Sequence, residues 1–371
     1  MRAALGFALA LCCACSKTGA GGDGGGAACG LSLSSWSQAD ALFQHDPAWI
    51  GSDAAYSIDL GGSRVLWLFG DTFIAKDGAR TRQNAWFIRN SVGIQSGSYD
   101  PSSPSAVMTF TWKAQTNGAA SSFIPENGTH WFWPLSGVRL SSRLVLFVLE
   151  EEPSTSGLGF QAVGTKIIFV TNPDADPATW MLSFGDLPTF AFPIAFGAAV
   201  VHDGVYVYAF GDEEPGDHSV YVARFDAASL DGGDASQPLF FTSGQWRPPT
   251  GSPPPDVIFP FSSSLDNPPT EFSVQKRTDG TWLAVHSIGF GSTHVAVRTA
   301  PAPEGPWTFP CDAFTPPESS RTDVLVYAAK AHPELAGLSS GGSPVITYAT
   351  NSTNSAALAS DMSLYFPRFV H

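Results

Sequence analysis

The sequence predicts an all-β protein, and its composition and turn pattern carry this prediction. Of the 371 residues only 14% are charged, whereas 37 are glycine and 29 are proline. That balance is typical of short strands joined by tight turns, and it disfavours surface helices rich in Lys and Glu. Apolar residues make up 43% of the chain, which is enough for a large core. The chain is therefore expected to be folded and built mainly of β-strands.

Five similar units follow one another after residue 30, and each has the pattern of strand, tight turn and strand. Gly-Gly and Asp-Gly between β-branched runs are strong hairpin signals. The second residue of each turn is Gly62, Ser142, Gly204, Gly280 or Gly342. Spacings of roughly 60 to 80 residues suit propeller blades of four strands with long loops. We predict a five-bladed β-propeller, with a β-sandwich of similar length as the alternative.

Further runs rich in β-branched and aromatic residues fill the gaps between these hairpins, and we expect them to supply the outer strands. They are AWFIRNSVGIQ, TKIIFVTNP, SVYVARFD, THVAVRTA and SLYFPRFV. No long segment shows the apolar period of 3.6 residues that marks an amphipathic helix. The nearest is DVLVYAAKAHPEL, whose first residues also fit a strand.

The N-terminal residues are typical of an export signal. Arg2 precedes a short apolar run, Ala3 to Leu11, which is too short for a transmembrane helix of roughly 20 residues. The segment CCAC resembles a bacterial lipoprotein signal with Cys15 as the lipidated residue, and simple cleavage is the alternative. We predict a signal at 1–15, a Gly-rich tether at 16–35 and a monomeric propeller domain at 36–371. The protein would be a surface or outer-membrane lipoprotein, or else secreted or periplasmic.

Charge and cysteine usage restrict the partners. A net charge of −14 argues against nucleic acid, which requires clustered Lys and Arg. Outside the leader only Cys29 and Cys311 remain; they form a disulfide in an exported protein, or else stay as two free buried thiols. No metal-binding Cys/His spacing is present, so we predict no metal site and no cofactor. The sequence leaves open whether a Ca²⁺ ion binds in the central channel, because oxygen ligands have no recognisable spacing in the sequence.

Carboxylates gather at the hairpin ends that a propeller would bring to one rim. Asp53 and Asp71 begin and end the first unit, and Glu271 begins the fourth. Paired carboxyl groups are what hydrolysis of a glycosidic bond requires. We therefore predict these three as catalytic residues, facing a polysaccharide or oligosaccharide. The predicted substrate-binding residues are His332, Glu126, His130, Trp131, Trp133, His286 and Asn351.

Each candidate also has a structural interpretation. Asp71 and Asp212 both follow Phe-Gly at a strand end, where Asp often caps a turn. We keep Asp71 as a supporting carboxylate because Asp53 lies opposite it, and we assign Asp212 to the fold. The run Glu150 to Glu152 beside Pro153 is predicted to be a solvated loop. Trp131 and Trp133 can equally be core residues, and His332 a structural histidine.

Several segments together resemble a known family: GSDAAYSIDLGGSRVLWLFGDTFIA, APAPEGPWTF, AKAHPEL, ITYATNS and LYFPRFV. They are similar to exported bacterial five-bladed propellers long labelled as of unknown function, over about residues 36–371. That group looks related to the propeller glycoside hydrolases that include arabinanases, invertases and levansucrases, and some relatives are endo-D-arabinofuranosidases. The resemblance implies cleavage of a furanoside such as arabinan.

The resemblance also implies roles for three carboxylates. The matching position for the nucleophile or base is Asp53, while a second Asp tunes it and a later Glu is the general acid. Asp71 and Glu271 are the candidates for those two roles, with Glu126 in reserve. The alternatives to an enzyme are a non-catalytic glycan-binding surface propeller and a structural scaffold whose rim carboxylates cap turns.

Overall fold

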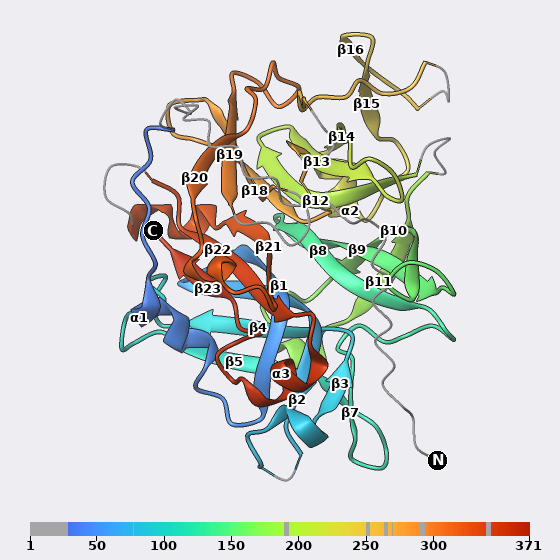
Figure 1. Ribbon diagram of the computed structural model, residues 1–371. Coiled ribbons are helices and arrows are strands. Elements are labelled where there is room, and N and C mark those ends of the chain that lie inside the picture. Colours follow the sequence, from blue (N-terminus) through green and yellow to red (C-terminus); the bar gives the residue numbers. More distant parts are fainter. Residues whose placement is uncertain are drawn as a thin grey trace.

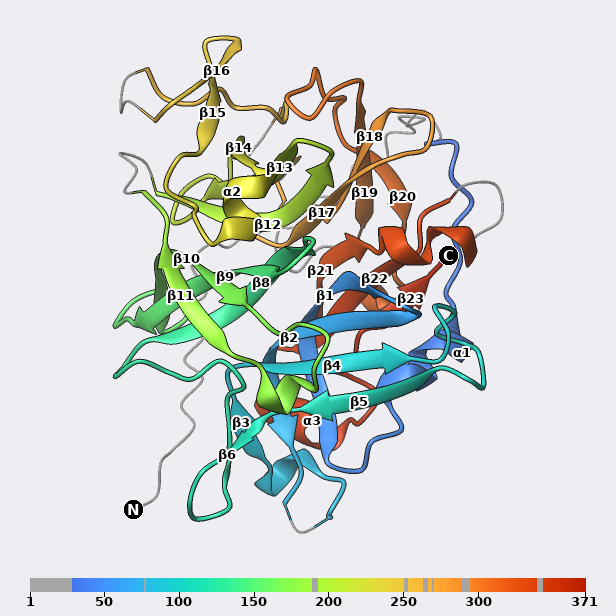
Figure 2. The ribbon, with the colours of Figure 1, turned by 180° about the vertical axis from the view of Figure 1, so that it is seen from behind.

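Five antiparallel sheets surround a central axis and form the blades of a β-propeller, as predicted (Figure 1). The first strand of each sheet contacts the first strands of the sheets on either side, so these strands line the axis in a closed ring. Figure 2 shows the same ring from behind. The computed structural model describes residues 29–76, 78–188, 193–249, 253–262, 266–268, 270–288, 294–338 and 343–371.

The first eleven strands form blades 1 and 2 and a small ribbon between them. Blade 1 consists of β1 (Trp49–Gly61), β2 (Arg64–Ile74), β4 (Ser91–Ser96) and β5 (Val107–Thr111), with β3 (Trp86–Ile88) beside the end of β2. A small ribbon follows, made of β6 (Lys113–Ala114) and β7 (Ala120–Ser121). Blade 2 consists of β8 (Trp131–Arg139), β9 (Leu144–Pro153), β10 (Phe160–Val170) and β11 (Leu182–Asp186).

Blades 3 to 5 repeat the pattern with different outer strands. Blade 3 consists of β12 (Ile194–Asp203), β13 (Tyr206–Glu213), β14 (Val220–Asp226), β15 (Leu239–Thr242) and β16 (Gln245–Arg247). Blade 4 consists of β17 (Phe272–Lys276), β18 (Trp282–Ser287), β19 (Val295–Ala300) and β20 (Cys311–Phe314). Blade 5 consists of β21 (Val324–Ala331), β22 (Ile346–Ser352) and β23 (Arg368–Val370).

The predicted turns join the first two strands of their blades. Gly61 and Gly62 both have positive φ, 79° and 62°, and close the β1–β2 hairpin, where glycine avoids the Cβ clash. Gly204 and Gly280 also have positive φ in the turns of blades 3 and 4. The fifth predicted turn, at residues 341–342, lies outside the described residues. The segment DVLVYAAKA, for which helix was the alternative, is strand β21.

The N-terminal segment completes the last blade. Backbone N–H groups of Ser34 and Trp36 donate to the carbonyls of His371 and Phe369, so residues 34–36 lie along the free edge of β23. A disulfide joins Cys29 to Cys311 on β20, with the Cα atoms 5.8 Å apart. The fold therefore begins before residue 36, where the tether was predicted to end. The predicted export signal, Cys15 included, lies outside the described residues.

Helices are short and peripheral. They are α1 (Ser37–Asp40), α2 (Ala227–Gly232), α3 (Ser355–Ser360) and the 3₁₀ helices Ala41–Phe43, Arg82–Asn84, Pro177–Thr179, Pro317–Ser320 and Pro333–Leu338. Within the described residues, none of the helices has the length and apolar character needed to span a membrane. The core lies between the blades and includes Trp49, Trp67 and Phe69, all fully buried.

Bulges interrupt the inner strands near the axis. The pairing register shifts around Ser52 to Tyr56 in blade 1, between Pro134 and Gly137 in blade 2, between Phe196 and Ala199 in blade 3, and between Tyr327 and Lys330 in blade 5. A bulge bends a strand and redirects the side chains beside it. In blades 1 and 5 the redirected side chains form the candidate site described next.

Candidate active site

Asp53 of β1 lies opposite a bulge in β2, where it alone faces Gly70 and Asp71. Ser52 pairs with Thr72, and Ala54 pairs with Phe69. Ala54 and Ala55 both have left-handed φ values, 64° and 63°. Two successive non-glycine residues in this region are strained, and such strain persists where surrounding structure holds it, often at functional sites. The bulge thus places the Asp53 carboxyl group on the rim.

Blade 5 supplies two phenols to the same carboxyl group. The hydroxyl of Tyr327 donates to Asp53 Oδ2 at 2.8 Å, and that of Tyr365 donates to the same atom at 3.3 Å. Tyr365 itself has φ 61°, a further strained position in contact with Asp53. Asn351 Nδ2 donates to the Tyr327 hydroxyl at 3.3 Å. Asn351, predicted to bind substrate, thus lies behind Tyr327 and orients it.

Gly70 makes room for Asp53. A Cβ at position 70 would lie 2.5 Å from Asp53 Oδ1, which is closer than real Cβ contacts allow. The glycine of Phe69-Gly70-Asp71 therefore has a steric reason to be there, beyond turn formation. The carboxyl group of Asp53 lies directly over the backbone of β2, next to Asp71.

Asp71 meets donors from blades 1 and 2. Trp133 Nε1 on β8 donates to Asp71 Oδ1 at 2.9 Å, and Arg89 Nη1 lies 3.3 Å from Asp71 Oδ2. Burial raises the pKa of Asp71 to about 6, although the charge of Arg89 and the Trp133 N–H lower it. Asp71 therefore becomes ionised near neutral pH, and the Trp133 N–H and Arg89 stabilise its negative charge.

Asp53 binds its proton more tightly than Asp71 does. Burial, followed by the negative charges of Asp71 and Glu271, raises the pKa of Asp53 to about 8, against the lowering effect of the two tyrosine hydroxyls. Two adjacent carboxyl groups that share one proton titrate as a pair. Between about pH 6 and 8 the pair carries one proton, which the electrostatics place on Asp53.

Glu271 forms an ion pair across blades 4 and 5. It precedes β17, and its Oε2 lies 2.6 Å from Nζ of Lys330 on β21. Lys330 is 1% exposed; it also donates to the Ala328 carbonyl and lies over the Tyr56 ring. Burial lowers the pKa of Lys330, while Glu271 raises it. Glu271 is thus held by a buried ammonium group, a setting different from that of the carboxyl groups of Asp53 and Asp71.

Glu150 and Glu151 are not in a solvated loop, and that prediction was wrong. Both belong to β9 and are 8% and 2% exposed. Glu150 accepts from His130 Nδ1 at 2.8 Å, whereas Oε2 of Glu151 has no hydrogen-bond partner among the described residues. Burial and the charges of Glu214 and Asp71 raise the pKa of Glu151 to about 8. Glu151 is thus a second proton-holding carboxyl group near Asp71, which sequence reasoning missed.

Aromatic side chains border the carboxyl groups on the side of blade 2. Trp133 is half-buried and packs edge-on against Trp131 and Phe160. The Arg89 guanidinium lies 4.2 Å from the centroid of the Trp131 ring, which is itself buried. Trp131 is therefore a core residue that supports Arg89, whereas Trp133 reaches the site through its N–H.

Four other predicted residues have hydrogen-bond partners other than Asp53 and Asp71. His130 bridges Glu150 and Glu152, and Glu126 is exposed in a loop where it accepts from Ser122. His286 is fully buried between the Ser287 carbonyl and Arg298, so its predicted contact with substrate is wrong. His332 is 1% exposed, and its two ring nitrogens form hydrogen bonds with the hydroxyl groups of Ser57 and Thr347. His332 thus has structural partners, and its contact with substrate stays a prediction.

An axial cavity of about 460 Å³ lies behind these residues. Tyr56, Lys330, His332 and Glu334 are among its lining residues, together with the turn end of β1 at Asp59. Burial raises the pKa of Glu334 to about 7. Lys330 thus lies between the carboxyl groups on the rim and this cavity along the propeller axis.

Comparisons with known proteins agree with this architecture. The family model described as a domain of unknown function (DUF5005) matches residues 37–371. A "putative hydrolase" from Bacteroides ovatus superposes with a TM-score of 0.71 at 20% identity, over 91% of this chain and 89% of its own. That likeness shows the same fold. No curated protein matches the sequence significantly.

Two glycosidases superpose less closely. A xylan β-1,4-xylosidase from Bacillus halodurans has a TM-score of 0.49 at 9% identity, over 88% of this chain and 53% of its own. The arabinanase Arb43A from Bacillus subtilis has a TM-score of 0.45 at 10% identity, over 87% of this chain and 96% of its own.

Proposed function

The chain belongs to the DUF5005 family, and we propose that it is a glycoside hydrolase that cleaves a polysaccharide with the carboxyl pair Asp53 and Asp71. The observation that carries the proposal is the unequal environment of the two groups. Asp53 is flanked by negative charge, whereas Asp71 has Arg89 and the Trp133 N–H. Environments that push two carboxyl pKa values apart are what separates the acid from the base in a glycosidase.

The environments also favour one assignment of roles. Near neutral pH, Asp53 holds the proton and donates it to the glycosidic oxygen, so the bond to the leaving sugar breaks with a neutral hydroxyl formed. Asp71, ionised, attacks the anomeric carbon or activates a water that does so. Glu271 forms an ion pair with Lys330, and its charge raises the pKa of Asp53. This assignment differs from the roles that the family resemblance implied. Asp53 takes the acid role implied for Glu271, Asp71 takes the nucleophile or base role implied for Asp53, and Glu271 takes the tuning role implied for Asp71.

The proposed substrate class is a furanoside such as arabinan. The support is the sequence resemblance, together with a rim on which Trp133 lies beside the reacting carboxyl groups. Indole rings offer apolar faces to the C–H surface of a sugar, while Arg89 and the tyrosine hydroxyls offer polar contacts to its oxygens. A neutral polysaccharide also suits a protein with a net charge of −14.

Export is part of the proposal. The Cys29–Cys311 disulfide is typical of proteins that fold in an oxidising compartment. Together with the export-like leader, it supports an extracellular or periplasmic location, with Cys15 as the proposed lipid anchor.

The test is a panel of polysaccharides, including arabinans, with product analysis for the wild type and for Asp53→Asn. We expect a loss of at least 100-fold in cleavage rate for Asp53→Asn, because general acid catalysis contributes about 10²–10⁴. Asp59→Asn is the matched control, since Asp59 lies on the same strand but at its exposed turn end. Equal rates in wild type and Asp53→Asn would exclude the mechanism. Glycan binding without products in the wild type would favour a non-catalytic binding propeller.

A further inference from the structure

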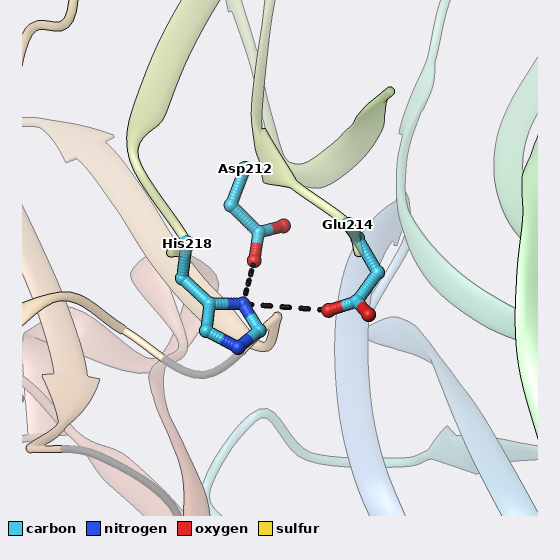
Figure 3. Close-up of side chains that lie close together, drawn as sticks. All are labelled: Asp212, Glu214 and His218. Carbon is cyan, nitrogen blue, oxygen red and sulfur yellow. Dashed lines mark hydrogen bonds and ion pairs between the residues drawn. The ribbon is translucent and has the colours of Figure 1, made fainter. Parts of the chain in front are cut away.

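Three side chains with metal-ligating atoms meet at the end of β13 in blade 3 (Figure 3). His218 Nδ1 lies 2.8 Å from Asp212 Oδ2 and 3.3 Å from Glu214 Oε2. The three ligand atoms all lie within 4.8 Å of one another. They come from one strand end and the loop after it, so a short segment of chain brings together two carboxylates and an imidazole.

Asp212 distinguishes this cluster from a group of surface acids. Its side chain is 0% exposed, and its Oδ1 has no hydrogen-bond partner among the described residues. A buried carboxylate oxygen without a partner costs free energy unless something compensates its charge. In Figure 3 the oxygen that does not meet His218 points to the side of the cluster on which Glu214 lies. Asp212 therefore brings two oxygens to the cluster, Oδ2 beside His218 and a buried Oδ1 without a hydrogen-bond partner among the described residues.

A fourth carboxyl group approaches from blade 2. Glu151 is 2% exposed, and its Oε2 likewise lacks a hydrogen-bond partner in the described parts of the chain. Among charged groups, Glu214 has the largest effect on the pKa of Glu151, which it raises. Two buried carboxyl groups from neighbouring blades therefore each have an unsatisfied oxygen near Glu214.

We propose that Asp212, Glu214 and His218 bind one divalent transition-metal ion, with Zn²⁺ as the best match. One imidazole nitrogen with two carboxylate oxygens is a donor set that suits Zn²⁺, whereas Ca²⁺ takes six to eight oxygen ligands. This site goes beyond the proposed hydrolase activity and does not depend on it.

Two of the three distances between ligand atoms agree with a tetrahedral ion after a small adjustment, and the third, between Asp212 and Glu214, is at most 4.8 Å. Ligand atoms about 2.0–2.1 Å from Zn²⁺ lie about 3.4 Å from one another in a tetrahedron. The 3.3 Å between His218 and Glu214 already fits, and the 2.8 Å between His218 and Asp212 must widen by about 0.6 Å. Three protein ligands leave the fourth position for water or for Glu151.

Neighbouring groups hold the carboxylates in place. The Thr270 hydroxyl donates to Glu214 Oε2 at 2.9 Å, and its backbone N–H donates to Asp212 Oδ2 at 3.2 Å. Such outer contacts orient metal ligands. Because Thr270 precedes β17 of blade 4, a bound ion would connect blades 3 and 4 at the rim.

The experiment is calorimetric titration of chelator-treated protein with Zn²⁺, Mn²⁺ and Ca²⁺ separately, in wild type and His218→Asn. Asn tolerates the left-handed φ of 59° at position 218 and is a poor metal ligand, so the fold should be kept. Circular dichroism checks the fold. Glu213→Gln is the matched control, because Glu213 is adjacent to two ligands but outside the cluster.

We expect wild type and Glu213→Gln to bind one Zn²⁺ per chain more tightly than Ca²⁺, and His218→Asn to bind it at least tenfold more weakly. The visible spectrum of bound Co²⁺ should show tetrahedral coordination in wild type and lose it in His218→Asn. Because Cys12, Cys13 and Cys15 also carry thiols, the difference between wild type and His218→Asn is the readout. Equal Zn²⁺ affinity in the two proteins, no binding to wild type, or a preference for Ca²⁺ would overturn the proposal.

Discussion

The sequence Phe-Gly-Asp occurs at the end of the second strand in both blade 1 and blade 3, and the two copies use it differently. Phe69 and Phe210 are both fully buried, so each anchors its strand in the core. At Gly70 a Cβ would meet a side-chain oxygen of Asp53, 2.5 Å away. At Gly211 a Cβ would meet the backbone oxygen of Ala195, 2.4 Å away. The first glycine makes room for a functional side chain, and the second for a neighbouring strand.

The two aspartates differ in the same way. Asp71 is partly exposed, opposes another carboxyl group and has Arg89 and Trp133 as donors. Asp212 is fully buried, pairs with Ala195 across the hairpin, and bonds His218. A shared local motif thus fixes where the carboxylate emerges, while contacts from other blades decide its chemistry.

Replacement of the two glycines by alanine should separate activity from stability. Gly70→Ala should displace the Asp53 carboxyl group and lower kcat by about 100-fold, since misplacing a catalytic group costs about this much. The unfolding free energy should change little, because the atom that must move ends a side chain. Gly211→Ala should instead cost about 1–3 kcal/mol of stability, because a backbone strand must move.

The measurements are steady-state kinetics and chemical denaturation of both variants. A large stability loss in Gly70→Ala with normal kcat per folded molecule would break the comparison, because the two glycines would then have the same structural role.

The pH dependence of activity should show whether the carboxyl groups at the Phe-Gly-Asp sequence of blade 1, and not those at the copy in blade 3, titrate in catalysis. With pair pKa values of about 6 and about 8, kcat/KM should be highest between them and fall about tenfold per pH unit on either side. Glu213→Gln, next to the second copy, should leave both limbs unchanged. A profile that stays flat from about pH 5 to 9 would exclude Asp53 and Asp71 as the acid–base pair.

The stability of the protein should also depend on Asp53. The native pKa of about 8 lies above the ordinary value of 3.8, so the folded state keeps a proton that the unfolded chain releases. This stabilisation is complete below about pH 4 and is lost as pH rises through about 8, with a slope of at most about 1.4 kcal/mol per pH unit. In Asp53→Asn the unfolding free energy should fall less between pH 5 and 8, measured by urea denaturation.

Asp279→Asn serves as the control for that measurement. Asp279 lies in an exposed turn, and its bonds to Thr281 hold its pKa below the ordinary value, so it does not titrate in this range. It should follow the wild-type pH dependence. If Asp53→Asn also follows it, the raised pKa of Asp53 is wrong.

Local sequence predicted most of the fold but only part of the site. Turn signals such as Gly61-Gly62 depend on neighbouring residues, and they located the hairpins correctly. The pairing of Asp53 with Asp71 followed from hairpin geometry. Tyr327 and Tyr365 could not be predicted, because they reach Asp53 across the join between blades 5 and 1. Such contacts depend on how blade 5 packs against blade 1 when the ring of blades closes.

Two sequence signals could have been used better. Lys330 stands in the apolar run VLVYAAKA, and a lysine buried in a strand requires a carboxylate partner, here Glu271. The run of three glutamates looked like a solvated loop, yet β9 continues through it, because His130 and Lys166 provide partners for Glu150. Charge density alone was misleading where neighbouring strands supplied counter-charges.

The smallest expected effect comes from removal of the Trp133 N–H group that donates to Asp71. Trp133→Phe keeps an aromatic ring at position 133 but removes the donor 2.9 Å from Asp71 Oδ1. Because that bond favours the carboxylate, its loss should raise the pKa of Asp71 and move the acidic limb of kcat/KM upward by about one pH unit. The basic limb should move less. Trp246→Phe, in the outer strand β16 of blade 3, should leave the profile unchanged. An unshifted acidic limb in Trp133→Phe would mean that this limb belongs to a carboxyl group other than Asp71, and Glu151 would then be the next candidate.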